Sequence, residues 1–283
     1  VLLLVIFRMN WFDALTHSFS TISTGGFSIR NNGAAYYNSP AVEWVFTVFM
    51  FLAGFNFALI WTLLRGKIGS VMRNSEARAY AGIVLVASLI ITAALTRQNH
   101  SLGTALRQAF FHVASLISTS GFYTADYGAW PSLAQCALFF LLFIGGCSGS
   151  VAGGPKVIRY VILTKQTWNE MKRLVQPRAV FSVQLDGKSG KKKAVYGVTG
   201  FMFLYFMTLF FASLLVSASG AGLWTSFNTA LICLGNVGIG LGPGGLFPSF
   251  PDYVKWGLCF VMIAGRLELC AVFALFTRDF WRE

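Results

Sequence analysis

The sequence predicts an all-α membrane protein made of repeated helical units, and three observations carry this prediction. The first is composition, because 55% of the 283 residues are hydrophobic and only 11% are charged, with a mean hydropathy of +0.64. A soluble domain of this length carries about 25% charged residues. The second observation is a set of long apolar runs, and the third is a glycine-containing motif that occurs three times.

Apolar runs that approach or exceed the length of a bilayer span recur along the chain. A transmembrane helix needs about 20 predominantly apolar residues. Candidate spans lie at residues 41–64, 79–96, 132–144, 194–216 and 253–276. The opening run VLLLVIF lacks a basic flank, so we expect the end of an outer helix there rather than a signal peptide.

Positive charge is distributed unevenly between the loops. Most of the 22 Lys and Arg residues lie in or beside residues 65–78, residues 156–193 and the tail after Thr277. Lys and Arg concentrate in cytoplasmic loops, so these basic segments are predicted to be cytoplasmic and the glycine-containing loops to face outward. Membrane topology therefore accounts for the net charge of +12 better than binding to nucleic acid does.

One motif occurs three times. The segments FDALTHSFSTISTGGF, RQAFFHVASLISTSGF and WTSFNTALICLGNVGI align with Gly26, Gly121 and Gly238 in register. Each copy has a short apolar run before the glycine, then a polar loop and a full-length apolar helix, which predicts outer helix, pore helix, re-entrant loop and inner helix. Irregular backbone is tolerated at membrane depth only where it is buried in protein or lines a wet cavity. The units are therefore expected to surround a central pore.

The repeated loops have the chemistry of a cation filter. A bare cation in a low-dielectric medium costs tens of kcal/mol, and rings of backbone carbonyls can replace its hydration shell. Glycine adopts cheaply the conformations that turn successive carbonyls inward. The candidate filter residues are Thr24, Gly25 and Gly26 in the first copy, Thr119, Ser120 and Gly121 in the second, and Asn236, Val237 and Gly238 in the third. These loops resemble a loosened form of the T-V-G-Y-G filter of potassium channels.

The segment GGCSGSVAGGPK, residues 145–156, interrupts an apolar run. Its spacing is close to that of a phosphate-binding P-loop, but Pro155 separates Gly154 from Lys156 and no strand precedes it. A tight contact between helices through small residues is one alternative. An unwound, movable segment is the other, because five glycines and two serines fall within ten residues.

Arg266 lies within an apolar segment, where a charge costs at least roughly 2.5–3.5 kcal/mol on insertion scales and is a functional candidate. Pairing with Glu268 is the structural alternative, although residues two apart lie on different faces of a helix.

His17 and His112 occupy equivalent places in two repeats, which favours packing on the pore helices over proton relay. The five cysteines show no CxxC spacing and are interpreted as small core residues.

Residues 169–193 form the longest basic stretch, and its Asp186-Gly187 pair favours a hairpin turn. Its charge serves topology or attracts anionic lipid headgroups. The sequence suggests no Ser-His-Asp arrangement and no intramembrane catalytic cluster, so an enzyme is disfavoured.

The motifs STGGFS, STSGFYTADY, GNVGIGLGP, GGCSGSVAGGPKVIRY and AGRLEL together resemble the TrkH/KtrB superfamily of potassium transporters, most closely its bacterial TrkH members. That family has four outer helix–pore loop–inner helix units around one pore, so the resemblance implies that three are present here and an N-terminal one is missing. The expected divisions are residues 1–66 for the end of an outer helix with the second pore loop and inner helix, 67–166 for the third repeat, 167–193 for a cytoplasmic basic hairpin or loop, and 194–283 for the fourth repeat.

The resemblance also implies a function and partners. It implies potassium uptake across the bacterial inner membrane, with no cofactor and K⁺ as the transported ion. It places a gate under the filter, formed by Gly145, Gly146, Ser148, Gly149, Gly153, Gly154, Lys156 and Arg266. A homodimer, membrane lipids and a cytoplasmic nucleotide-binding ring of the TrkA type are the expected partners. Symport coupled to Na⁺ or H⁺ is the alternative function, and a non-conducting membrane scaffold is a weaker one.

Overall fold

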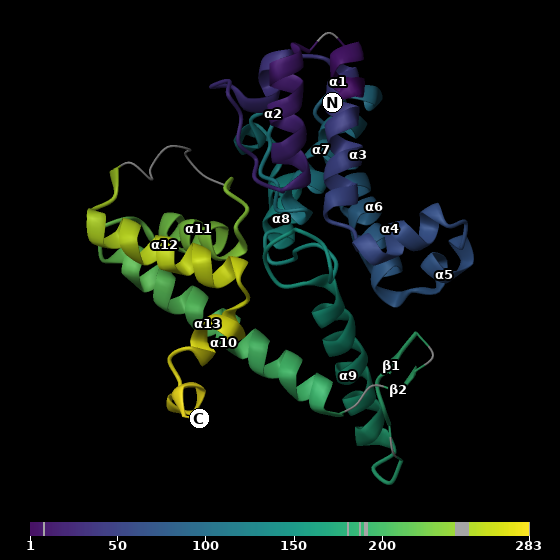
Figure 1. Ribbon diagram of the computed structural model, residues 1–283, viewed down its shortest axis with the longest axis vertical. Coiled ribbons are helices and arrows are strands. Elements are labelled where there is room, and N and C mark those ends of the chain that lie inside the picture. Colours follow the sequence, from purple (N-terminus) through teal and green to yellow (C-terminus); the bar gives the residue numbers. More distant parts are fainter. Residues whose placement is uncertain (8, 180, 187, 190–191, 241–248, 283) are drawn as a thin grey trace.

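The computed structural model is almost entirely helical (Figure 1). It describes residues 1–7, 9–179, 181–186, 188–189, 192–240 and 249–282. Residues 241–248, which include the end of the GNVGIGLGP motif, and the lysine at position 191 of the basic stretch lie outside the described residues.

The helices follow the order outer helix, pore helix, inner helix. The first unit contains α1 (Leu2–Ile6), α2 (Trp11–Ile22), the 3₁₀ turn η1 (Gly33–Tyr37), α3 (Pro40–Ala53), α4 (Phe57–Leu64) and α5 (Ile68–Arg73). The second contains α6 (Ser75–Thr96), α7 (Leu102–Ile117), η2 (Tyr127–Ala129), α8 (Ser132–Leu141) and α9 (Val157–Val175). The third contains α10 (Lys192–Ser217), α11 (Leu223–Gly235), α12 (Asp252–Arg266), α13 (Leu269–Ala274) and η4 (Arg278–Trp281). The short helices α2, α7 and α11 are thus the pore helices.

A short antiparallel pair of strands, β1 (Gln184–Leu185) and β2 (Lys188–Ser189), lies between the second and third units. The two strands flank the Asp186-Gly187 pair that favoured a turn in the sequence. In Figure 1 the pair lies beside the far end of α9, away from the pore helices.

The inner helices are interrupted, which corrects the expectation of a full-length inner helix in each unit. The apolar run 41–64 forms α3 and α4, which are bent by 107° at the break between them. The run 253–276 is divided between α12 and α13 at Glu268, whose φ is 68°. The run 132–144 is helical only as far as Leu141, three residues before the glycine-rich segment that begins at Gly145.

Two described helices are long and apolar enough to cross a membrane alone, α6 and residues Ala194–Ser217 of α10, and the bent pair α3–α4 would be a third. Apolar side chains stay exposed along one side of α10, where they are suited to contact lipid. They include Phe203, Phe210, Phe211 and Leu214. The protein is therefore a membrane protein.

A buried ion pair joins the first unit to the second. Arg107 on α7 places its Nε 2.7 Å from Oε2 of Glu43 on α3, and the two side chains are 22% and 11% exposed. Charges this far from water are costly when either loses its partner. The pair therefore makes the packing of α3 on α7 dependent on both residues.

Replacing Glu43 by Ala should lower the melting temperature measured by intrinsic fluorescence in detergent. Removing one partner of a buried pair costs about 3–5 kcal/mol, because the remaining charge is buried alone. Asp252→Ala is the matched control, since Asp252 pairs with Lys255 at 3.4 Å but is 90% exposed, and exposed pairs contribute about 0–1 kcal/mol. Equal melting temperatures for the two variants would contradict this account of the α3–α7 contact.

Candidate functional site

The three aligned loops share one backbone pattern. In each loop the first and third residues have positive φ and the middle residue does not. The φ values are 54° and 69° at Thr24 and Gly26, 55° and 74° at Thr119 and Gly121, and 54° and 80° at Asn236 and Gly238. Positive φ is easy for glycine but uncommon for a β-branched residue such as Thr. Alternating the sign of φ turns successive peptide groups the same way, which a row of carbonyl ligands requires.

The loops lie side by side in chain order. A Cβ atom at Gly26 would lie 1.9 Å from the main-chain oxygen of Ser120, and one at Gly121 would lie 2.2 Å from that of Val237. At Gly238 a Cβ would meet no atom within 4 Å in the described part of the chain. Glycine is thus required at the first two contacts by space as well as by φ, because a neighbouring carbonyl fills the place of a side chain.

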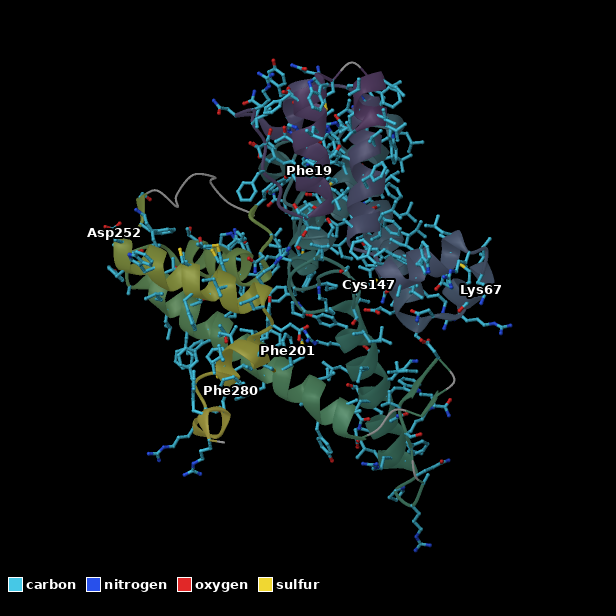
Figure 2. The ribbon with its side chains drawn as sticks, in the orientation of Figure 1. Phe19, Lys67, Cys147, Phe201, Asp252 and Phe280 are labelled. Carbon is cyan, nitrogen blue, oxygen red and sulfur yellow. The ribbon has the colours of Figure 1, made fainter. Side chains whose placement is uncertain are left out.

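The intramembrane segment, residues 145–156, lies against the start of all three loops. Its contacts are the N–H of Gly153 to Oγ1 of Thr119 at 2.7 Å, the oxygen of Val151 to Oγ1 of Thr24 at 3.4 Å, and Gly153 packed against the main-chain oxygen of Gly235 just before Asn236. The candidate filter and candidate gate are therefore one connected structure. In Figure 2, Cys147 of this segment lies near the centre of the molecule.

The intramembrane segment is a closed loop with its ends tied together. The N–H of Gly145 donates to the oxygen of Pro155 at 2.9 Å, and the N–H of Val157 donates to that of Gly146 at 3.1 Å. A Cβ at Gly145 would lie 2.1 Å from the oxygen of Gly153, so the two ends approach more closely than any side chain would permit. Nζ of Lys156 donates to the oxygen of Ala152 inside the loop. Gly149 and Gly154 have positive φ.

The break between α3 and α4 receives the intramembrane segment. The oxygen of Gly54 accepts a hydrogen bond from the N–H of Cys147 at 2.8 Å. Nδ2 of Asn56 donates to the oxygen of Ser148 at 2.5 Å, while its Oδ1 accepts from the first N–H groups of α4. In a straight helix the oxygen of Gly54 and the first N–H groups of α4 would form hydrogen bonds within the helix. The 107° bend frees them, and the intramembrane segment docks at this bend.

Arg266 is the last residue of α12, where the negative end of the helix dipole favours a cation. Its Nη2 donates to the oxygen of Ser23 at 3.3 Å, and its Nη1 lies 3.5 Å from Oγ1 of Thr24. Glu268 pairs instead with Arg159 at 3.1 Å, so the alternative pairing of Arg266 with Glu268 is not the one observed. A positive charge therefore stands at the base of the first loop.

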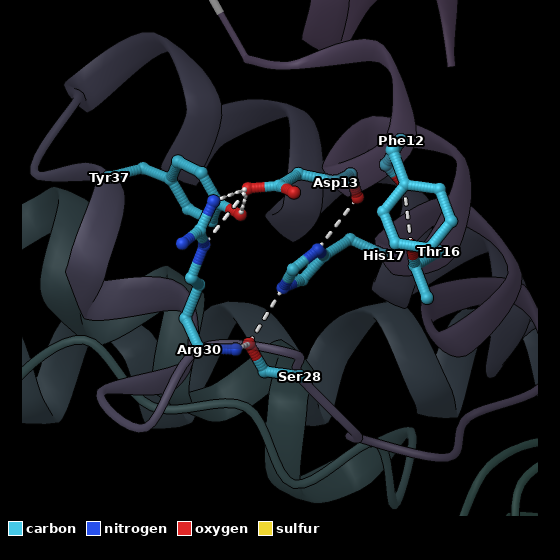
Figure 3. A network of polar contacts seen from close by, with 7 residues as sticks. All are labelled: Phe12, Asp13, Thr16, His17, Ser28, Arg30 and Tyr37. Atoms are coloured by element: carbon cyan, nitrogen blue, oxygen red, sulfur yellow. Dashed lines mark hydrogen bonds and ion pairs between the residues drawn. The ribbon is translucent and has the colours of Figure 1, made fainter.

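A polar network supports the first loop from behind (Figure 3). Asp13, near the start of the short helix α2, accepts hydrogen bonds from Tyr37 at 2.8 Å and from Nη2 of Arg30 at 2.9 Å. These partners, the Tyr37 hydroxyl foremost, lower the pKa of the Asp13 carboxyl despite its burial. His17 bonds through Nε2 to Oγ of Ser28, two residues beyond Gly26, at 2.9 Å. The carboxylate, guanidinium and imidazole thus fix the loop onto its pore helix.

The two repeated histidines are buried, as the packing interpretation predicts. His112 packs edge-on against Trp130, with ring centroids 4.8 Å apart, and its Nδ1 lies 2.8 Å from the oxygen of Gln108.

A hollow of about 530 Å³ lies beside the third aligned loop. Its lining includes Tyr123, Asp126, Tyr127 and Gly238. The hydroxyl of Tyr127 donates to the oxygen of Gly240 at 2.8 Å and so joins η2 to the residues that follow the third aligned loop.

Sequence reasoning missed the polar residues that hold these parts together. Asp13, Glu43 and Glu76 are buried, and Asn56 caps α4 while binding the intramembrane segment. The signal available in the sequence was composition. The chain has only 10 acidic residues, and an acidic side chain beside an apolar run is rarely buried unless it is paired. Their partners come from distant segments, which no local pattern identifies.

Comparison with known proteins places the chain in a family. The family model TrkH, described as cation transport protein, matches residues 5–94 and 83–281. The Trk system potassium uptake protein TrkH of Salmonella typhimurium is 38% identical over 276 residues, which cover 96% of this chain and 57% of that protein. The protein of the same name from Escherichia coli K12 is 37% identical over 97% of this chain and 58% of its own length.

A solved structure gives the same result. The potassium transporter TrkH from Vibrio parahaemolyticus superposes with a TM-score of 0.93 at 34% identity, over 99% of this chain and 61% of that one. The chain thus spans somewhat more than half the length of these relatives. The resemblance drawn from the motifs is confirmed, and the chain belongs to the TrkH family of cation transport proteins.

Proposed function

We propose that this chain forms part of a potassium uptake pathway in the bacterial inner membrane, with its three loops as filter and its intramembrane segment as gate. The observation that carries the proposal is the shared alternation of φ in three adjacent loops. The named relatives support the ion, since they are Trk system potassium uptake proteins.

Selection would rest on main-chain oxygens. A carbonyl carries a strong dipole but no net charge, so it can replace hydration water and still release the ion. The middle residues of two loops, Ser120 and Val237, place their oxygens against the glycine of the preceding loop. The pore helices α2, α7 and α11 end at the loops, so their partially negative ends add to the attraction for a cation.

Closure would rest on the intramembrane segment and on Arg266. The segment occupies the space at the base of the three loops, where an ion leaving the filter would have to pass. Two like unit charges about 4 Å apart repel by roughly 4 kcal/mol at an effective dielectric of about 20. That repulsion corresponds to nearly a thousandfold lower occupancy, so the guanidinium beside Thr24 would be a substantial barrier.

The basic segments would face the cytoplasm and the outer hollow would face the exterior. On the cytoplasmic side, a hollow of about 840 Å³ lies between α9 and residues 181–184 and is lined by Lys165, Trp168 and Lys172. Its cationic and aromatic lining suits an acidic surface of a regulatory ring or anionic lipid headgroups. A homodimer and a nucleotide-binding ring belong to this proposal through the family resemblance.

Gly121→Ala should reduce ⁸⁶Rb⁺ uptake by at least about tenfold and lower the preference for K⁺ over Na⁺. Alanine would strain a backbone at φ 74° and place a methyl group 2.2 Å from the oxygen of Val237. Gly82→Ala in α6 is the matched control, since its Cβ would meet nothing within 4 Å. The assay uses liposomes containing the complete protein, with elution volume on size exclusion as the check on folding.

Gly238→Ala should give an intermediate loss, because it introduces the same strain at φ 80° without the contact. Normal flux and selectivity in both the Gly121 and Gly238 variants would contradict a carbonyl filter. Uptake that required an imposed Na⁺ or H⁺ gradient would favour the coupled alternative.

Arg266→Ala should increase ⁸⁶Rb⁺ flux through the closed protein, because it removes the positive charge at the base of the first loop. Arg266→Lys keeps a charge there and should change flux less. Arg278→Ala removes an exposed arginine from η4 and serves as the control. Unchanged or lower flux in Arg266→Ala would count against a barrier role.

A further inference from the structure

Glu76 binds the start of the intramembrane segment through a buried carboxylate. It is the second residue of α6, and it is 5% exposed. Its Oε1 accepts a hydrogen bond from the N–H of Ser148 at 2.5 Å. One side chain from the outer helix α6 therefore fixes the start of the segment.

Burial of the Glu76 carboxylate is costly, and the hydrogen bond from the N–H of Ser148 partly offsets that cost. Hydrogen bonds to an ionised acceptor are shorter and stronger than those between neutral groups.

The position of Glu76 is itself fixed. Oδ1 of Asn74 caps α6 by accepting from the N–H of Ala77 at 2.9 Å. Asp186, in the turn between β1 and β2, accepts from Nδ2 of Asn74 at 3.0 Å and from the N–H of Ser75 at 2.7 Å. The start of α6 is thus held between the intramembrane segment and the cytoplasmic strand pair.

We propose that Glu76 is the positioning residue that clasps the intramembrane segment and holds it against the filter loops. The clasp rests on the gating role proposed above, and it adds a residue outside the pore that stabilises the closed position. Movement of the start of the segment away from the loops requires the hydrogen bond between Ser148 and Glu76 to break.

Cys147 reports on the clasp without reference to ion flux. It is 0% exposed and directly precedes Ser148, so a thiol reagent reaches it only when the segment moves. Glu76→Gln replaces the carboxylate by a neutral amide, whose oxygen is a weaker acceptor for the N–H of Ser148. We expect maleimide modification of Cys147 in the complete protein in liposomes, followed by peptide mass spectrometry, to be at least about fivefold faster in this variant.

Two controls separate the clasp from general destabilisation. Glu170→Gln changes an exposed carboxylate on α9 that pairs only within its own helix, with Arg173, and should leave the rate unchanged. Cys233, buried on α11, should also keep its rate in Glu76→Gln. Equal acceleration at Cys233 and Cys147, or no acceleration at Cys147, would overturn the clasp.

Flux measured on the same variants distinguishes the clasp from the gate. Faster labelling of Cys147 with unchanged ⁸⁶Rb⁺ flux would support the clasp and tell against the gating function of the segment. Unchanged labelling in Glu76→Gln, together with raised flux in Arg266→Ala, would overturn the clasp and leave the gate in place.

Discussion

The rest of this structure depends on the close approach of bare backbone from one repeat to the next. At Gly26 and Gly121 the neighbouring carbonyl occupies the place where a Cβ would stand, so only hydrogen fits there. This contact sets the loops in one order and, with the alternation of φ, aims their peptide groups together. Backbone exposed in this way is tolerable in a membrane only where it is buried in protein or lines a wet cavity.

The breaks in the inner helices follow from the same constraint. The intramembrane segment is not helical, so its backbone groups need partners outside a helix and away from lipid. The bend at Gly54 and Asn56 supplies two of these partners, and Thr119 supplies another from the base of the second filter loop. The segment is therefore bound both to the aligned loops and to the broken inner helix, so that these parts form one hydrogen-bonded assembly. Glu76 binds the segment itself, and Arg266 binds the first loop.

Much of this arrangement could be predicted from the sequence, because its signals are local or periodic. The register of Gly26, Gly121 and Gly238 predicted three equivalent loops, and the glycines at 145–154 predicted an unwound segment. The break at Gly54 was missed because one glycine in an apolar run is compatible with a straight helix. The pairs Asn56–Ser148 and Glu76–Ser148 join residues 92 and 72 positions apart, so no sequence window contains them. The position of Arg266 at a helix end depended in the same way on the break at Glu268.

The central claim is that main-chain oxygens of the three loops take the place of water around potassium. Anomalous diffraction from crystals of the complete protein soaked in Tl⁺, a heavy-atom substitute for K⁺, tests it most directly. The account predicts anomalous density between the loops, within coordination distance of the oxygens of Ser120 and Val237. Ions bound only to side chains elsewhere, with no density between the loops, would contradict it.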